Sequence, residues 1–223
     1  MSYKFIALSI GGLLLAPAAH ATIIDGSFSG TLGSGTDISG VFNEAPGSNL
    51  SGDTVTGTFV YNTASFTGTP SGSTEQYTAT GPGALTVTLT INGVSHIFTD
   101  SANSSIYLDS SGTSEVTYVA NASSIIGSTS VSDTFVLDVI DPSNPFVAST
   151  SLNQSFSTTN PDVSTGTFSI NDSNPTLAAN GSFTLGALSQ APAPTATPEP
   201  ASLALLTVGV AGLAGLKRRR TIR

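Results

Sequence analysis

The strongest constraint on the fold is a segment in which apolar and hydroxyl side chains strictly alternate. Residues 84–91 read Ala-Leu-Thr-Val-Thr-Leu-Thr-Ile, which puts the large apolar side chains on one face and the threonines on the other. A period of two is that of a β-strand with one buried face. Asn92-Gly93 follows, and these residues accept the positive φ that a type I′ turn requires. The sequence therefore predicts a β-hairpin whose return strand covers residues 94–99.

The two-residue loop also sets the register of this hairpin. The expected pairs are Ile91 with Val94, Leu89 with His96, and Val87 with Phe98. His96 then lies on the apolar face, where a histidine is more often a packed or edge residue than a catalytic base. A Ser-His-Asp hydrolase would need His96 as its base, and the chain has no Gly-x-Ser-x-Gly elbow between a strand and a helix. We therefore do not expect an enzyme, and an extracellular hydrolase is the least favoured alternative.

Several other segments are short, rich in β-branched or aromatic residues and bounded by turn residues, as strands are. They are residues 23–28, 54–61, 115–120, 131–140, 164–170 and 182–188. Outside the two ends of the chain, no window combines a helical period with helix caps. Many short strands with frequent turns predict an all-β fold, either an antiparallel β-sandwich or a jelly roll.

One three-residue element recurs, in which a glycine precedes a hydroxyl residue and a phenylalanine. Its copies are Gly26-Ser27-Phe28, Gly57-Thr58-Phe59, Gly166-Thr167-Phe168 and Gly181-Ser182-Phe183. The spacing is irregular, so the copies do not form a solenoid repeat. We interpret the element as a strand start, where glycine permits a bend, the hydroxyl faces solvent and the phenylalanine enters the core.

The distribution of charge limits the partners of the central region. Between Thr22 and Thr197 there is no lysine or arginine, whereas every acidic residue except Glu199 lies there. Binding of nucleic acid needs cations that neutralise phosphates, so this class of partner is excluded. The chain has no cysteine, which excludes disulfides, thiolate metal sites and a cysteine nucleophile. Neutral sugars and divalent cations remain compatible with such a surface.

Two kinds of ligand site are conceivable in this region. Asp138, Asp141 and Asn144 lie close together near a turn, and oxygen-rich loops suit calcium, although the EF-hand spacing is missing. The alternative is ordinary turn capping by Asp and Asn, which we favour. No other cofactor is indicated. A carbohydrate-binding face would need clustered aromatic residues, and the candidates are Phe59, Tyr61, Tyr77, Phe98, Tyr107 and Tyr118.

The first residues have the features of a secretory signal peptide. Lys4 provides the positive charge, residues 5–15 are mostly apolar, and Ala19-His20-Ala21 offers small residues at Ala19 and Ala21 for signal peptidase. We expect cleavage after Ala21, which makes residues 1–21 the signal peptide and residues 22–190 the mature acidic domain.

The last residues form an ordered series of segments. A Pro-rich linker over residues 191–197 leads to Pro198-Glu199-Pro200, and residues 201–216 then carry no charge. A helix over 201–216 would rise about 24 Å, slightly less than the roughly 30 Å hydrocarbon core of a bilayer. A basic stop follows, consisting of Lys217, Arg218, Arg219 and Arg220. The positive-inside rule places this stop in the cytoplasm and the acidic domain outside.

This tail resembles the PEP-CTERM sorting domain in the motif, in Ala201-Ser202 after it, in the apolar segment and in the basic cluster, over residues 198–223. The resemblance implies a bacterial protein that is exported and then recognised and cleaved near the motif by an exosortase. It also implies a Gram-negative host with exopolysaccharide or biofilm loci. The acidic domain is similar to the β-rich passenger domains of this family, which implies no activity.

Together these features predict an exported surface or extracellular-matrix protein. We expect it to be held in the inner membrane through residues 201–216 before processing, and to reach the cell surface or medium afterwards. Its expected role is structural or adhesive and linked to exopolysaccharide. The alternative is a carbohydrate- or calcium-binding module.

Overall fold

A computed structural model describes residues 21–99, 101, 103–126, 129–171 and 177–193. The fold is all-β, with one short 3-10 helix, η1 (Thr63–Ser65), among the described residues. The strands are β1 (Ile23–Asp37), β2 (Ser48–Asn49), β3 (Thr54–Asn62), β4 (Phe66–Ser71), β5 (Thr74–Ala79), β6 (Leu85–Ile91), β7 (Val94–Thr99), β8 (Ser105–Asp109), β9 (Glu115–Ile126), β10 (Thr129–Ile140), β11 (Phe156–Thr159), β12 (Val163–Asn171) and β13 (Leu177–Pro192).

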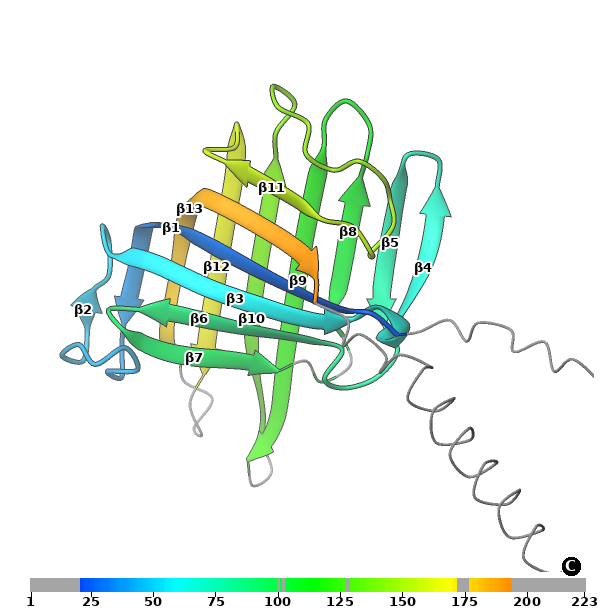
Figure 1. Ribbon diagram of the computed structural model, residues 1–223. Coiled ribbons are helices and arrows are strands. Elements are labelled where there is room, and N and C mark those ends of the chain that lie inside the picture. Colours follow the sequence, from blue (N-terminus) through cyan, green and yellow to red (C-terminus); the bar gives the residue numbers. More distant parts are fainter. Residues whose placement is uncertain (1–20, 100, 102, 127–128, 172–176, 194–223) are drawn as a thin grey trace, which may run out of the picture.

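These strands form one continuous antiparallel sheet rather than two separate sheets. The order is β4-β5-β8-β9-β10-β12-β13-β1-β3-β6-β7, with β2 added to β1 and β11 added to β13. The sheet curls so that β1, β3, β6 and β7 cross in front of β9, β10 and β12 (Figure 1). The all-β, antiparallel prediction is therefore confirmed, and the two facing layers of a sandwich-like core come from one sheet.

The curl is made by the two longest strands, β1 and β13, which run together through the corner between the layers. Their pairing shifts register between Ser29 and Gly30 and again between Leu32 and Ser34. Such bulges bend a strand and increase its local twist. A side chain at Gly30 would come within 2.1 Å of the Thr184 carbonyl oxygen, so glycine permits the close approach at the bend.

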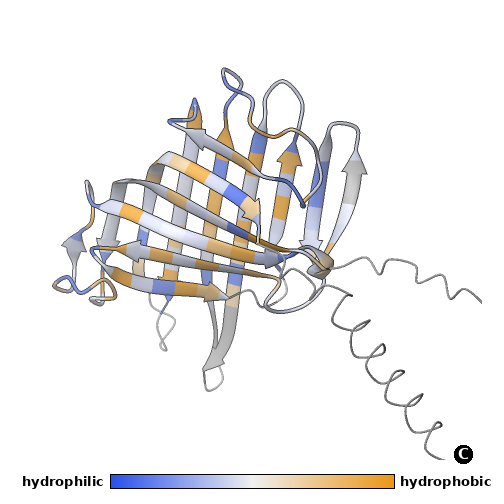
Figure 2. Ribbon diagram, viewed as in Figure 1, coloured by the Kyte–Doolittle hydropathy of each residue, from blue (hydrophilic) through white to orange (hydrophobic). Residues whose placement is uncertain are grey.

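The core lies between the two layers and is rich in aromatic rings. Along the strands, apolar residues alternate with polar ones, as the striped colouring shows (Figure 2). Phe59 of β3 lies 4.4 Å from Tyr118 of β9 between ring centroids, and Phe98 of β7 lies 5.6 Å from Phe135 of β10. Rings therefore join the layers across the curl. Buried apolar area of this kind contributes about 25 cal/mol per Å².

The recurring element places its phenylalanines in the core, as predicted, but its glycines have a different role from the predicted one. Gly26 pairs with Phe59 while Phe28 pairs with Gly57, and Gly166 pairs with Phe183 while Phe168 pairs with Gly181. A Cβ on Gly26 would lie 2.0 Å from the Phe59 ring, and the other three glycines are covered in the same way. These glycines are inside paired strands and have no positive φ. They do not permit a bend at a strand start; they make room for the phenylalanine of the neighbouring strand.

The predicted hairpin is confirmed in detail. Asn92 and Gly93 have φ values of 50° and 77°, as a type I′ turn requires. The pairs Ile91–Val94, Leu89–His96 and Val87–Phe98 are the expected ones. The other predicted strands are all present, and most are longer than predicted.

Several strands were not predicted. β4 and β5 contain Gly68, Pro70 and Glu75, which are poor strand formers, so pairing with neighbours rather than propensity determines them. In β8, Ile106 and Leu108 are buried on either side of a more exposed Tyr107. The sequence shows apolar residues at these alternate positions, so β8 could have been predicted from it.

The two ends of the domain meet at one corner. Ile24 of β1 pairs with Pro192 of β13, and the Ala193 N–H donates a 2.8 Å hydrogen bond to the Ile23 carbonyl. β13 thus continues through Pro192, two positions into the range predicted as a linker. Residues 1–20 of the predicted signal peptide, including Ala19, and the sorting tail lie outside the described residues. In the part of the chain that the structure describes, no helix is long and apolar enough to cross a membrane.

Candidate functional site

His96 belongs to a pair that links the layers. Its Nε2 lies 3.1 Å from Oδ2 of Asp133, in the only ion pair among the described residues, and its ring packs against Phe98 at 4.8 Å between centroids. The other oxygen, Oδ1 of Asp133, accepts a 2.9 Å hydrogen bond from the Asn171 N–H. No serine or threonine hydroxyl is bonded to His96 in the described structure. The pair connects β7 to β10 across the curl.

The calcium candidates fall on different faces. Asp138 points outward from β10 and accepts a 2.9 Å hydrogen bond from the Thr117 hydroxyl. Asp141 is buried and accepts hydrogen bonds from the Thr158 hydroxyl at 2.8 Å and from the Asn144 N–H at 3.1 Å. Asp141 therefore caps a turn. Within the described ranges, no three His, Asp or Glu side chains gather in a way that could hold a metal ion.

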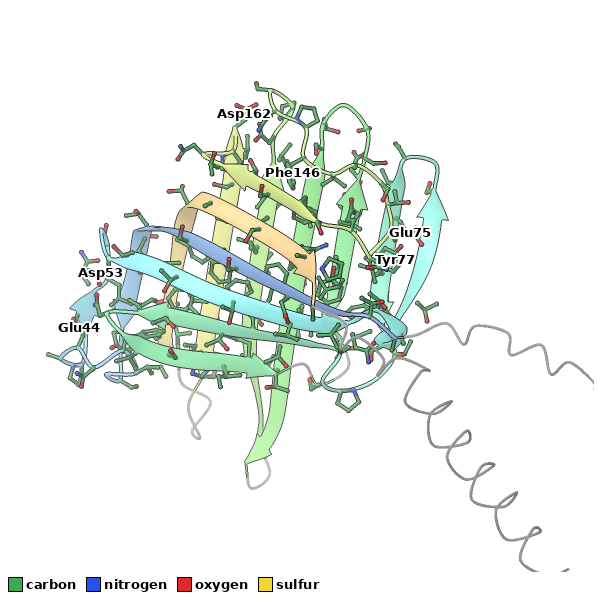
Figure 3. All side chains as sticks on the ribbon, in the orientation of Figure 1. Glu44, Asp53, Glu75, Tyr77, Phe146 and Asp162 are labelled. Carbon is green, nitrogen blue, oxygen red and sulfur yellow. The ribbon has the colours of Figure 1, made fainter. Side chains whose placement is uncertain are left out.

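Carboxylates are otherwise scattered over the surface. Glu75 and Asp162 lie apart from each other, whereas Glu44 and Asp53 lie on the same side of the molecule (Figure 3), where Nδ2 of Asn92 donates to both, at 3.1 and 2.9 Å. One group is closer together: burial raises the pKa of Glu115, and the nearby carboxylates of Asp138 and Asp109 raise it further. These acids repel one another and have no lysine or arginine nearby in the domain to offset them.

Most of the aromatic carbohydrate-binding candidates are in the core. Phe59, Tyr61, Phe98 and Tyr118 are at most 1% exposed, so they cannot form a binding platform. These four residues therefore do not supply the aromatic face that the alternative of a carbohydrate-binding module would need, because the alternation along their strands turns them inward. Tyr77 is half-buried; its hydroxyl donates a 2.7 Å hydrogen bond to the Thr150 carbonyl, and burial raises its pKa to about 12.

Two of these tyrosines join a buried polar network. The hydroxyls of Tyr61 and Tyr118 both donate to Oε1 of Gln190, at 3.0 and 2.5 Å. Nε2 of Gln190 donates to the Gln154 carbonyl at 3.1 Å. Burial raises the pKa of both phenols well above the ordinary value, so both remain protonated donors. The network ties β3, β9 and β13 together and offers no nucleophile or base.

The opposite, outward side of β1, β3 and β6 carries a regular array of hydroxyl groups, which we call the hydroxyl face. Register places Ser27, Thr58 and Thr88 in one row and Ser29, Thr56 and Thr90 in the next, with Thr31 beside Thr54. The row at the other end is mixed, because Thr86 lies beside Val60 and Val60 beside Asp25. Neighbouring strands lie about 4.8 Å apart, which sets the spacing of hydroxyls along each row.

The edges of the hydroxyl face are joined to further hydroxyls. Ser27 Oγ lies 2.9 Å from Ser189 Oγ on β13, and Thr90 Oγ1 lies 2.8 Å from Ser95 Oγ on β7. The side-chain hydroxyls of Thr54, Thr56 and Thr58 make no hydrogen bond within the described part of the chain, and these threonines are exposed. They are therefore available to water or to a ligand.

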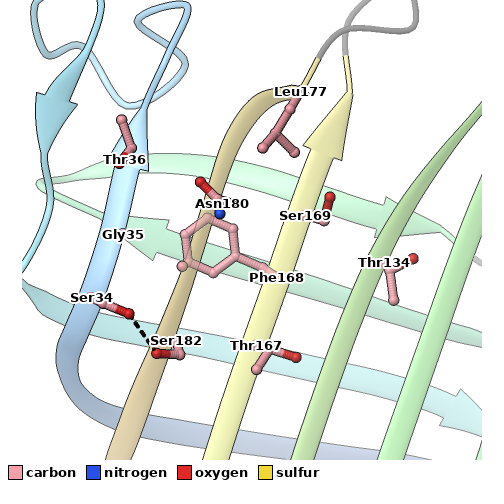
Figure 4. Close-up of a pocket in the computed structure, with 11 residues that line it drawn as sticks. Ser34, Gly35, Thr36, Thr134, Thr167, Phe168, Ser169, Leu177, Asn180 and Ser182 are labelled. Atoms are coloured by element: carbon pink, nitrogen blue, oxygen red, sulfur yellow. Dashed lines mark hydrogen bonds between the residues drawn. The ribbon is translucent and has the colours of Figure 1, made fainter.

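A separate hollow of about 520 Å³ lies over β1, β10, β12 and β13, and its lining also contains the apolar Phe168 and Leu177. Its lining includes Ser34, Thr36, Thr134, Thr167 and Asn180 (Figure 4). Ser34 and Ser182 share a hydrogen bond of 2.9 Å between their Oγ atoms at one side of it. The hollow contains no charged residue, so it suits neutral polar groups.

The alternation in residues 84–91 predicts a face of threonines opposite the apolar one, and this is the β6 part of the hydroxyl face. The same period in β1 and β3 would have located their hydroxyl rows, which were not predicted. Which strands lie side by side could not be read from local sequence, because β3 pairs with β6 across an intervening excursion through β4 and β5.

Comparison with known proteins identifies the tail. Residues 196–220 match the model of the PEP-CTERM protein-sorting motif, which confirms the resemblance. The chain is therefore an acidic all-β domain followed by a PEP-CTERM sorting signal, and this motif implies an exported protein that is processed by an exosortase. No curated protein and no solved structure matches the chain.

Proposed function

We propose that this protein is a structural or adhesive component of the exopolysaccharide matrix of a Gram-negative bacterium. The observation that carries the proposal is the hydroxyl face, an array of serine and threonine hydroxyls bordered by Asp25 and Val60, on a domain without a lysine or arginine. Such a surface can exchange hydrogen bonds with neutral sugars and repels polyanions. Among the described residues, no group of side chains converges as an active site would.

The proposed route begins with export and ends with release. Signal peptidase cleaves after Ala21, and the next residue is already held by the fold, since the Thr63 N–H donates a 3.0 Å hydrogen bond to the Thr22 carbonyl. Residues 201–216 then hold the chain in the inner membrane, with Lys217 to Arg220 in the cytoplasm. The exosortase cleaves near Pro198-Glu199-Pro200 and the domain moves to the surface or the medium.

Processing is tested in a host that has an exosortase. The wild-type chain is expected to lose its tail and leave the membrane fraction, as an immunoblot of the domain would show. Glu199→Ala, which alters only the motif, should remain full-length in the inner membrane. Glu44→Ala is the matched control, because Glu44 is an exposed acid far from the motif. Equal processing of both variants would contradict the proposed role of the motif.

The adhesive role is tested by binding to immobilised neutral polysaccharide. Thr54, Thr56 and Thr58 are replaced together by valine, which keeps the branched shape and removes the hydroxyls. We expect the valine variant to lose binding and a triple serine variant to retain it. Unchanged binding by the valine variant would rule out the hydroxyl face as the adhesive surface.

Calcium-dependent binding is the second candidate function, and the polysaccharide-binding assay distinguishes it from binding through hydroxyl groups. Adding EDTA should leave binding unchanged if hydroxyls carry it. A loss of binding in EDTA, restored by calcium, would favour a calcium-dependent module instead.

A further inference from the structure

The two ends of the sheet differ in how well they are protected. β4 and β7 are the terminal strands of the sheet order, and each pairs with one neighbour. A terminal strand leaves a row of N–H and C=O groups unpaired, and these can pair with another chain. The other edge strands, β2 and β11, have only two and four residues.

The backbone geometry of β4 blocks its free edge. Its turn makes Ser71–Thr74 a hydrogen-bonded pair, so that the bonded and non-bonded pairs alternate from there. Pro70–Glu75 is therefore a non-hydrogen-bonded pair, in which the backbone nitrogen of Pro70 faces away from β5. Proline has no N–H to donate at this outward position. A second strand could not form a regular ladder along β4.

β7 has no such protection. In its hairpin Ile91–Val94 is a hydrogen-bonded pair, and so are Leu89–His96 and Val87–Phe98. The intervening Ser95, Ile97 and Thr99 direct their backbone N–H and C=O groups away from β6. None of these groups has a partner among the described residues. A lysine on an edge strand often prevents pairing with another chain, and this domain contains no lysine.

The surface of β7 also suits contact with an identical surface. Ile97 is 58% exposed, the highest value among the exposed large apolar residues. Residues 84–99 contain no acidic side chain, although the domain as a whole is strongly anionic. The positions that a second copy would face directly, residues 95–99, therefore bring no carboxylate of their own. The acids lie at the ends of the strand, where Asp100 follows Thr99 and Glu44 and Asp53 accept hydrogen bonds from Asn92. His96 is already paired with Asp133 on the inward side.

We propose that β7 pairs antiparallel with β7 of a second copy, about a two-fold axis through Ile97. Ile97 then opposes Ile97 of the other copy, and Ser95 opposes Thr99, so that all three outward backbone positions are bonded. The two sheets become continuous and extend the hydroxyl face across both copies. Because Pro70 blocks the opposite edge, the association closes as a dimer and does not grow into a fibre.

The full chain allows a direct test because it has no cysteine. Cα atoms of a directly opposed pair lie about 5.5 Å apart, within the range that a disulfide can span. When the I97C chain is exported into an oxidising bacterial periplasm, we expect a disulfide-linked dimer as the main band on a non-reducing gel. V163C is the control, because Val163 is similarly exposed, at 54%, on the interior strand β12; it should stay monomeric.

A second measurement does not depend on cysteine chemistry. The full chain in detergent micelles is compared with I97K by sedimentation, so that any association of the tail is common to both. The wild type should sediment as the larger species, and I97K should lose that species. Equal cross-linking of I97C and V163C, no cross-linking of either, or equal sedimentation of wild type and I97K would overturn the proposal.

Discussion

At the scale of single residues, the exchange of glycine and phenylalanine between paired strands is the most demanding feature of the core. The two reciprocal pairs, β1 with β3 and β12 with β13, place each ring directly over a backbone without a side chain. The stacked rings of Phe28 and Phe183, 5.8 Å apart between centroids, join the two pairs. The packing therefore depends on residues that contribute no side chain.

Replacing one of these glycines should be costly. In Gly166→Ala the new Cβ would lie 2.0 Å from the Phe183 ring, so the ring must move. We expect a loss of about 1–3 kcal/mol in unfolding free energy, measured by urea denaturation. Gly112→Ala is the control, because nothing lies within 4 Å of its Cβ. If Phe183→Leu does not reduce the effect of Gly166→Ala in a double-mutant cycle, the ring contact is not the cause.

The raised pKa of Glu115 predicts how the stability of the fold depends on pH. Folding raises this pKa, first by burial and then through Asp138 and Asp109. The folded state therefore favours the neutral carboxyl, and stability falls as pH rises from the unfolded pKa through the higher folded one. Glu115→Gln should be more stable than wild type at pH 7, and this advantage should disappear below about pH 4 in thermal melts. An advantage that persists at acid pH would contradict the electrostatic explanation.

At the scale of secondary-structure elements, the hairpin of β6 and β7 could be predicted because its information is local. Two adjacent strands, a two-residue turn and strict alternation determine each pair. β4 and β5 could not be predicted in that way, since Pro70 and Glu75 disfavour strands and only their neighbours hold them. Of the aromatic candidates, Phe59, Tyr61, Phe98 and Tyr118 lie on predicted strands and are buried. Tyr77 and Tyr107 lie on β5 and β8, which were not predicted.

The side chain of Gln190 joins the three strands β3, β9 and β13 through hydrogen bonds from Tyr61 and Tyr118. Gln190→Ala would leave the buried hydroxyl of Tyr118 without its acceptor, whereas the hydroxyl of Tyr61 still lies 3.1 Å from the Leu152 carbonyl. We expect a loss of about 1–3 kcal/mol in unfolding free energy. Gln76→Ala, at an exposed position on β5, should change stability by less than about 0.5 kcal/mol in the same denaturation experiment. Similar losses for both variants would argue against the network.

At the scale of the whole molecule, the curl and the meeting of the ends were beyond the sequence analysis. Both depend on β13, which pairs with β12, β11 and β1. These partners lie at the start and in the second half of the chain, so no local pattern reveals them. The hydroxyl face is also a property of this scale, because its rows exist only once β1, β3 and β6 are side by side.

The position of β13 predicts which truncations are tolerated. A chain that ends at Ala193 should unfold at the same temperature as one that ends at Thr197, because β13 is complete at Pro192. A chain that ends at Asn171 lacks β13 and should not unfold cooperatively when followed by circular dichroism. A cooperative transition in that shorter chain would show that β13 is dispensable for the core.

The same strand determines how the domain bears mechanical load. Under the proposed function, in which the tail is held in the membrane before processing and the outer surface adheres, tension would enter the domain at the carboxyl end of β13. β13 is flanked by β1 on one side, and by β12 and then β11 on the other. A pull along its axis therefore loads these ladders in shear, so that many hydrogen bonds resist together instead of opening one after another.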